Sequence, residues 1–214
     1  MQDIIIVCAG SYGREIYWCL QENNRLAAEK GKEVPYHILG FLSDVFVDLE
    51  HYGIHEKVLG RIDNWKPIAN EKYALGLGKP KDKKKLAEQL KQRNMDFINV
   101  ISEWASIVPG IKMGEGCFIT AGSFIGCDVV IGNFVNINGS MIYSGAHIEN
   151  YCTTTGFTVI ENATLHEGVY VGSKAVVMES CEVGEWVNVS VGSVITENIR
   201  PNVTVFGMPA QEIG

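Results

Sequence analysis

A glycine-rich turn and a carboxylate are the features of this chain whose positions suggest ligand chemistry. The turn, residues 9–13, follows a short apolar run and precedes a segment with helical periodicity. Free backbone N–H groups at the start of a helix bind phosphate, so the turn is a candidate anion site. Ser43 and Asp44 end a second apolar run, where the carboxylate can accept hydrogen bonds from a nucleoside. Gly10 and Gly13 are equally explained by a tight strand–helix turn, and the sequence leaves both interpretations open.

These residues would be positioned by a small parallel sheet. Strands are predicted at residues 4–9, 36–42, 73–77 and 97–101, and helices at residues 14–30 and 81–94. A β-α-β-β-α-β order favours an α/β sheet that binds ligand at the carboxyl ends of its strands. The basic run at residues 79–85 falls mostly on the solvated face of the second helix, and within it only Lys81 is a site candidate.

The charge and the cysteine pattern of the chain argue against several classes of binding partner. The net charge is −7 and the isoelectric point is near 5.3, which gives no net positive field to hold nucleic acid or an anionic membrane. The six cysteines lack metal-ligand spacing, so we expect buried thiols in a reducing compartment and no metal. The apolar start at residues 4–7 is too short to cross a bilayer, and we expect a cytoplasmic protein without a membrane partner.

The second half of the chain repeats every six residues. Aliphatic residues, with one threonine, recur at this spacing, with one-residue slips placed before Ile142 and before Thr153. The set is Ile107, Met113, Ile119, Ile125, Ile131, Ile137, Ile142, Ile148, Thr153, Val159, Leu165, Val171, Val177, Val183, Val189 and Ile195. Neither a helix nor a single strand requires this period, whereas a coil of three short strands and three corners does.

The repeat therefore predicts a parallel β-helix with the aliphatic residues stacked inside and glycine at tight corners. We expect two domains, residues 1–100 as a small Rossmann-like α/β domain and residues 101–214 as the hexapeptide-repeat solenoid. The segment 197–214 is expected to run back along the coils as a cap.

The order and spacing of several motifs resemble one family over nearly the whole chain. The motifs are residues 4–15 (IIIVCAGSYGRE), 40–44 (GFLSD), 58–60 (VLG), 77–80 (LGKP), the hexads and residues 205–210 (VFGMPA). In these the chain resembles the sialic acid O-acetyltransferase and bacillosamine-pathway N-acetyltransferase family of sugar acetyltransferases. The resemblance implies a left-handed β-helix, a homotrimer, and acetyl transfer from acetyl-CoA to a nucleotide-linked sugar in bacterial surface-glycan biosynthesis.

The same resemblance assigns binding residues by position. Nucleotide-sugar contacts would be Gly10, Ser11, Tyr12, Ser43, Asp44, Gly78 and Lys81, and acetyl-CoA contacts would be Thr153, Ser173, Val191, Gly192 and Pro209. Small side chains and backbone amides at coil corners suit an extended pantetheine arm, although solenoid packing alone also explains them. Tyr12 stands where the family usually has a histidine.

The catalytic position departs from the family pattern. The acceptor must lose a proton as it attacks the thioester, and the family uses a histidine tuned by a carboxylate for this step. That position is Ser144 here, and the family's second histidine falls on Thr153. His147, oriented by Glu149, is then the candidate base, and His166 is a further candidate. Alternatively, an amine acceptor is partly neutral already, and positioning together with Ser144 or a water would suffice.

Four functions remain open. They are an acetyltransferase acting on a nucleotide-linked amino or deoxy sugar, an O-acetyltransferase of sialic acid, a non-catalytic binder of nucleotide sugar and CoA, and a structural solenoid. A scaffold would not require the glycine turn or the polar strand ends. Release of CoA with one sugar acceptor would distinguish the enzymes from the binder.

Overall fold

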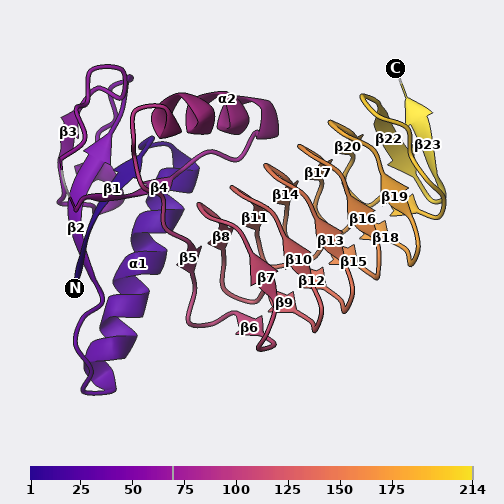
Figure 1. The fold of residues 1–214 in the computed structure, drawn as a ribbon, viewed down its shortest axis with the longest axis horizontal. Helices are drawn as coiled ribbons and strands as arrows, with labels where there is room; N and C mark the ends of the chain where they lie inside the picture. The colour runs from indigo at the N-terminus through magenta and orange to yellow at the C-terminus, as the bar shows by residue number, and fades with distance from the viewer. Residues whose placement is uncertain (69, 214) are drawn as a thin grey trace.

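The computed structural model describes residues 1–68 and 70–213, which form a small α/β domain followed by a parallel β-helix (Figure 1). The α/β domain has a four-stranded parallel sheet in the order β3-β2-β1-β4. Its strands are β1 (Gln2–Val7), β2 (Tyr36–Leu42), β3 (Val58–Gly60) and β4 (Lys72–Leu75). Its helices are α1 (Ser11–Glu29), the short 3-10 helix η1 (Glu50–Tyr52) and α2 (Pro80–Lys91).

Residues 4–7 of β1 are buried on both faces, which explains why all four are apolar. Ile4 and Ile6 pack with Leu20 of α1 in one cluster, and Ile5 and Val7 pack with Leu90 of α2 in the other. This alternation follows from the two-residue period of a strand. The sheet is therefore covered by one helix on each face.

Two predicted elements of this domain differ from the structure. The predicted strand 97–101 is wrong as a member of the sheet, because only Phe97 forms an isolated bridge to Tyr73, and β5 (Val100–Ile101) belongs to the solenoid. Strand β3 was missed, since its three residues at the sheet edge are too few to show a pattern. Helix α1 begins three residues before the predicted start, directly after the glycine at the end of the first run.

The solenoid consists mainly of two-residue strands that stack in parallel into three sheets, and Figure 1 shows its successive coils. One sheet contains β5, β8 (Phe118–Ile119), β11 (Asn136–Ile137), β14 (Thr153–Thr154), β17 (Tyr170–Val171), β20 (Asn188–Val189), β22 (Thr204–Gly207) and β23 (Ala210–Ile213). We call it the domain-facing sheet. The second sheet contains β6 (Ser106–Ile107), β9 (Phe124–Ile125), β12 (Met141–Ile142), β15 (Val159–Ile160), β18 (Val176–Val177) and β21 (Val194–Ile195). The third contains β7 (Lys112–Met113), β10 (Val130–Ile131), β13 (His147–Ile148), β16 (Thr164–Leu165) and β19 (Glu182–Val183).

The predicted hexad register is confirmed except at two positions. Thr154 pairs with Val171 and Ile160 pairs with Val177, so these residues, and not Thr153 and Val159, occupy the stacked interior positions. The second slip therefore follows Ile160. The sequence could not separate the two registers, because Thr153 and Thr154 are identical and both residues of β15 are aliphatic. As a consequence, Thr153 faces outward, toward the α/β domain.

The end of the chain closes the solenoid differently from the prediction. Strand β22 continues the domain-facing sheet beside β20, and β23 pairs antiparallel with β22. The predicted course back along the coils is wrong, since a terminal hairpin covers the last strand instead (Figure 1). Gly214, the last residue of the predicted cap, lies outside the described residues.

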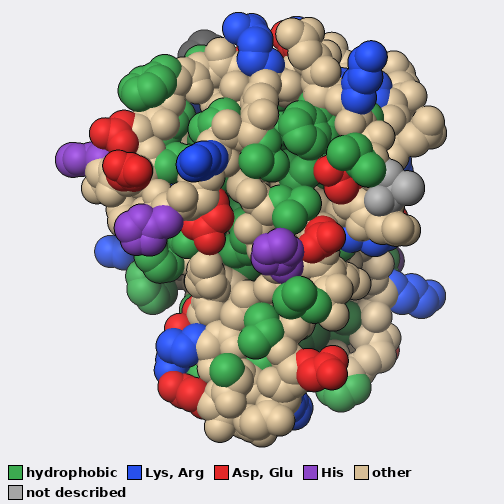
Figure 2. Space-filling view, turned by 90° about the vertical axis from the view of Figure 1, so that its left-hand side faces the viewer, with side chains coloured by type: hydrophobic (Ala, Val, Ile, Leu, Met, Phe, Trp, Pro, Cys, Tyr) green, Lys and Arg blue, Asp and Glu red, His purple; other side chains and the backbone are tan. Residues whose placement is uncertain are grey.

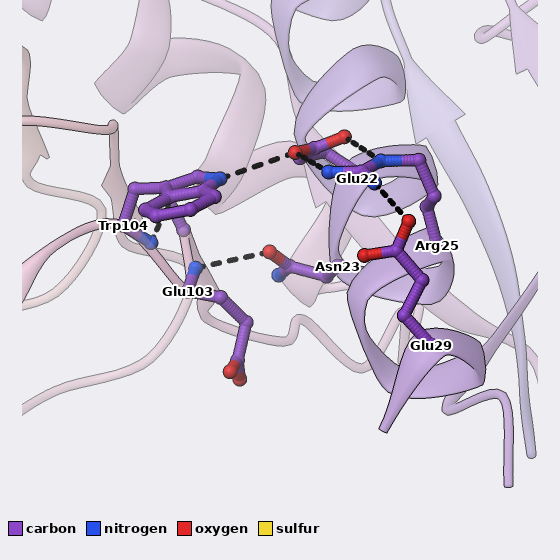
Figure 3. A network of polar contacts seen from close by, with 7 residues as sticks. Glu22, Asn23, Arg25, Glu29, Glu103 and Trp104 are labelled. Carbon is purple, nitrogen blue, oxygen red and sulfur yellow. Dashed lines mark hydrogen bonds and ion pairs between the residues drawn. The ribbon is translucent and has the colours of Figure 1, made fainter. Parts of the chain in front are cut away.

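A polar clamp joins α1 to the first coil of the solenoid (Figure 3). The buried Asn23 donates from Nδ2 to the carbonyl of Ile101 at 2.7 Å and accepts from the backbone N–H of Glu103 at 3.0 Å. Trp104 Nε1 donates to Glu22 at 3.1 Å. Because both polar ends of Asn23 are satisfied by the solenoid backbone, the clamp fixes how α1 meets the first coil.

On the face of the α/β domain seen in Figure 2, side chains of opposite charge are mixed. Figure 2 shows acidic, basic and hydrophobic side chains interspersed on that face. Among the described helices, none is long and apolar enough to cross a bilayer.

Candidate functional site

A cavity of about 430 Å³ opens where the carboxyl ends of β1 and β4 meet the solenoid. Its lining residues are Gly10, Ser11, Tyr12, Gly76, Leu77, Gly78, Lys79, Asp82 and Tyr170. We call it the edge pocket. Four of the predicted sugar-nucleotide contacts, Gly10 to Tyr12 and Gly78, lie together in it, and Tyr170 of β17 adds a wall that sequence reasoning missed.

The start of α1 supplies free backbone donors to this pocket. Gly10 is the N-cap residue, and no side chain caps the N–H groups that follow it. Such groups, together with the helix dipole, favour an anion. The first turn thus retains the property that the sequence indicated.

Gly13 serves packing and not the pocket. A Cβ atom on Gly13 would lie 1.9 Å from the carbonyl oxygen of Cys8, and one on Gly76 would lie 2.5 Å from Cα of Gly13. A Cβ on Gly10 would meet nothing within 4 Å. Of the two interpretations left open by the sequence, close approach of β1, α1 and β4 explains Gly13.

Tyr12 forms the contact between the edge pocket and the solenoid. Its hydroxyl accepts a hydrogen bond from Asn138 Nδ2 at 3.1 Å, and its ring lies against Gly78. Burial raises the pKa of the Tyr12 hydroxyl to about 12, so the group stays neutral and can donate to a ligand.

A second cavity, of about 720 Å³, continues from the edge pocket along the domain-facing sheet. The two share Lys79, Asp82 and Tyr170. Lys81 lies in this second cavity, opposite Trp186, and not in the edge pocket. The sequence predicted Lys81 as a contact only from its position in the family resemblance, and no signal in the sequence indicated Trp186.

Ser43 and Asp44 lie apart from the edge pocket. They line a separate hollow of about 440 Å³ that shares no residue with it. Asp44 accepts a hydrogen bond from the backbone N–H of Ile62 at 3.0 Å, and the Ser43 hydroxyl donates to the carbonyl of Val45 at 2.8 Å. Both side chains therefore hold the loop after β2 in place.

Lys83 is buried between α2 and the solenoid, although the sequence placed most of its basic run on a solvated face. It is 1% exposed, and its Nζ donates to the carbonyl of Cys152 at 3.0 Å and to Thr153 Oγ1 at 2.9 Å. The Thr153 hydroxyl in turn donates to the carbonyl of Gly78 at 2.8 Å. Burial lowers the pKa of Lys83 to about 7.

The predicted acetyl-CoA contacts divide into two groups. Ser173, Val191, Gly192 and Pro209 lie at or beside the corner that follows the domain-facing sheet, where the N–H of Gly192 donates to the carbonyl of Ser173 at 2.9 Å. Thr153 lies instead on the face of that sheet, fully buried beneath α2. Its side chain is occupied by Lys83 and Gly78.

The catalytic candidates lie on the solenoid away from its domain-facing sheet. Ser144 is at the corner before the third sheet, with Oγ 3.1 Å from the thiol of the exposed Cys127. His147 is exposed on β13 of the third sheet. Within one chain, these residues are on different sheets from the edge pocket.

His166 is held more firmly than His147. Its Nδ1 lies 3.1 Å from Glu149 and its Nε2 lies 3.4 Å from Glu182. Burial opposes the charged imidazole, but hydrogen bonds to Glu182 and Glu149 outweigh it and raise the pKa. Glu149, which the sequence assigned to orient His147, is engaged by His166 instead.

Among residues 1–68 and 70–213, no group of histidine, cysteine or carboxylate side chains is arranged to hold a metal ion. No family model matches the chain.

Curated relatives match part of the chain. The serine acetyltransferase of Buchnera aphidicola subsp. Acyrthosiphon pisum is 31% identical over 107 residues, which cover 49% of this chain and 36% of that protein. The chain spans less than half the length of the curated relatives it matches.

Solved structures match the whole chain. The acetyltransferase domain of PglB from Neisseria gonorrhoeae FA1090 is 18% identical, over 100% of both chains, with a TM-score of 0.83. Its complex with acetyl coenzyme A matches over 99% of both chains with a TM-score of 0.81. PerB from Caulobacter crescentus, in complex with CoA and GDP-perosamine, is 19% identical with a TM-score of 0.85, over 100% of this chain and 98% of that one. The resemblance found in the sequence is thereby confirmed at the level of fold, and the chain has the small α/β domain and left-handed parallel β-helix of the hexapeptide-repeat sugar acetyltransferases.

Proposed function

We propose that the protein is an acetyl-CoA-dependent acetyltransferase that acts on the amino or hydroxyl group of a nucleotide-linked sugar in bacterial surface-glycan biosynthesis. The observation that carries the proposal is the edge pocket, which joins the anion-binding start of α1 to the outer face of the solenoid. Full-length likeness to the acetyltransferase domain of PglB, and to PerB holding CoA and GDP-perosamine, supports it.

In this proposal the edge pocket binds the nucleotide sugar. The N–H groups after Gly10 hold a phosphate, with Ser11 and Tyr12 as hydroxyl contacts and Gly78 as the opposite wall. Lys81 lies in the adjoining cavity, where its ammonium can meet a second phosphate. Ser43 and Asp44 would contact the ligand only if it extends across the sheet edge to their own hollow.

Acetyl-CoA is proposed to lie along the corner of Ser173, Val191, Gly192 and Pro209. Small residues there leave room for the pantetheine arm: a Cβ on Gly192 would meet nothing within 4 Å. The structure favours leaving Thr153 out of this contact set, because its side chain is inaccessible.

The chemistry is proposed to use groups from two subunits. The acceptor amine attacks the thioester carbonyl, the C–S bond breaks, and the amine proton passes to His147 as the CoA thiolate leaves. Ser144 would hold the acceptor or a bridging water. Because both residues lie on different faces from the edge pocket, a neighbouring subunit of a homotrimer would have to bring them to it.

The test is release of free CoA thiol from acetyl-CoA in the presence of UDP-, GDP-, dTDP- and CMP-linked amino and deoxy sugars. Release that depends on one acceptor supports the proposal and names the sugar. Silence across the panel, with binding of CoA retained, would favour the non-catalytic binder, which the absence of both family histidines also favours.

His147→Ala is expected to lower turnover by about 10²- to 10⁴-fold, the usual contribution of a general base, while leaving the unfolding temperature unchanged because the residue is exposed. The comparison is His166→Ala in the same thiol assay. Full activity of His147→Ala together with loss in His166→Ala would move the base to His166.

Exposed apolar side chains at the CoA corner predict self-association. Phe157 is 76% exposed, Val191 61% and Met208 78%. Several large exposed apolar side chains at one corner favour an interaction surface. Light scattering is expected to give three times the 23.6 kDa chain mass, and Phe157→Glu is expected to give monomers. Phe46→Glu, at a phenylalanine of the α/β domain that is 93% exposed, should leave the trimer intact; a monomeric wild type would refute the prediction.

A further inference from the structure

Lys83 has too few partners for a charged amine. An ammonium group has three N–H donors, and only Cys152 O and Thr153 Oγ1 accept from Nζ. Among the described residues no carboxylate pairs with it, and the side chain is 1% exposed. A neutral amine has two N–H donors, which match the two acceptors. Geometry and burial therefore both describe an uncharged Lys83 in the free protein.

The groups around Lys83 give it no counter-charge. From the solenoid, the thiols of Cys152 and Cys117 face it, and burial raises their pKa values to about 12 and about 11, so both are neutral. Asp82 on α2 and Lys79 at the N-cap of α2 line the edge pocket. Above neutral pH, a charge on Lys83 would thus require an anion from outside the chain.

The edge pocket is the place from which such an anion would act. Thr153 Oγ1 links Lys83 Nζ to the carbonyl of Gly78, which is part of the pocket wall, through contacts of 2.9 and 2.8 Å. Charges interact more strongly across the protein interior than through water. A diphosphate bound at the start of α1 and α2 would favour the charged amine, and the charged amine would favour the diphosphate in equal measure.

We infer that Lys83 is a positioning residue whose protonation is coupled to binding of a phosphate-bearing ligand in the edge pocket. The inference rests on the proposed function. Where Lys83 is neutral in the free protein, binding takes up a proton on it, and ligand affinity falls as the pH rises above neutrality. Between pH 7 and 8.5 neither the Tyr12 hydroxyl nor the two thiols titrate, because burial raises all three pKa values to about 11 or above.

Calorimetry in buffers of different ionisation enthalpy measures this proton directly. The probes are UDP-glucose, GDP-mannose, dTDP-glucose and CMP-N-acetylneuraminate, whose phosphodiester groups do not titrate in this range. At pH 8 the wild type is expected to take up a large fraction of one proton with the tightest probe, and its affinity should fall about tenfold between pH 7 and pH 8.5. Lys83→Met should bind without proton uptake and without this pH dependence.

Lys85→Met is the matched control, since it makes the same substitution at an exposed position of the same helix and should retain the proton uptake. If Lys83→Met does not fold, the wild type still decides the matter. Its Lys83 side chain, followed by NMR of ¹³C-labelled lysine, should titrate near neutrality alone and at higher pH with the probe. Binding with no proton uptake would overturn the inference while leaving the proposed function intact; binding of none of the probes would overturn both.

Discussion

Gly13→Ala is expected to destabilise the protein by more than about 4 kcal/mol, an effect that single substitutions reach only in tightly constrained places. The added methyl group would lie 1.9 Å from the carbonyl oxygen of Cys8, which belongs to the backbone and cannot rotate away. Helix propensity alone predicts the opposite sign, because alanine in a helix interior is favoured over glycine by about 1 kcal/mol. A loss of stability in Gly13→Ala would therefore show that the steric clash outweighs the helix propensity of alanine.

Gly10→Ala is the control for this prediction. Gly10 has φ −68°, which any residue adopts, and its Cβ would meet open space. Chemical unfolding monitored by circular dichroism should place this variant within about 1 kcal/mol of the wild type. Equal stability of Gly13→Ala and Gly10→Ala would mean that β1, α1 and β4 do not approach as closely as described.

The second large effect is the pH dependence that Lys83 imposes on stability. Its pKa falls from 10.5 to about 7 on folding, so between these values the unfolded chain holds a proton that the folded chain lacks. Stability must then rise with pH across this window, by about 1.4 kcal/mol per unit and roughly 5 kcal/mol in all. Below pH 7 Lys83 is protonated in both the folded and the unfolded chain. There its burial lowers the stability by an amount that does not depend on pH.

Lys83→Met isolates this contribution. Buried thiols lower the stability as the pH rises above 9, since burial raises the pKa values of Cys8 and Cys152 to about 12. This effect is the same in the wild type and in Lys83→Met. The difference in unfolding free energy, wild type minus variant, is therefore the quantity to measure by urea titration from pH 6 to pH 10. It should become more favourable to the wild type as the pH rises. A difference independent of pH would show that Lys83 is not neutralised by folding.

The sequence predicted the architecture well where the signal was periodic. The six-residue repeat located the solenoid because its interior positions are aliphatic in nearly every hexad. Register failed only where adjacent residues were equivalent, at Thr153 with Thr154 and at Val159 with Ile160. Hydrophobicity identifies a face, and it cannot choose between two neighbours of the same kind.

The site was predicted in part. The turn at Gly10 and the wall at Gly78 were found because both follow apolar strands, and parallel strand ends share one edge. Tyr170 was missed, since no local pattern indicates which coil will lie beside α2. Lys83 was missed although a signal existed: it precedes Ala87 and Leu90 by four and seven residues, the spacing of one helix face.

The hydrophobic clusters beneath α1 and α2 contain residues of both the α/β domain and the solenoid. Phe118 of β8 belongs to the hydrophobic cluster beneath α1, and Phe134 and Tyr151 belong to the one beneath α2. A recombination event that joined a foreign α/β domain at residue 100 would mismatch these aromatic side chains, whereas a junction after the third coil would carry them along. Exchange of ligand specificity between relatives should therefore transfer the α/β domain and the first coils as one inherited block.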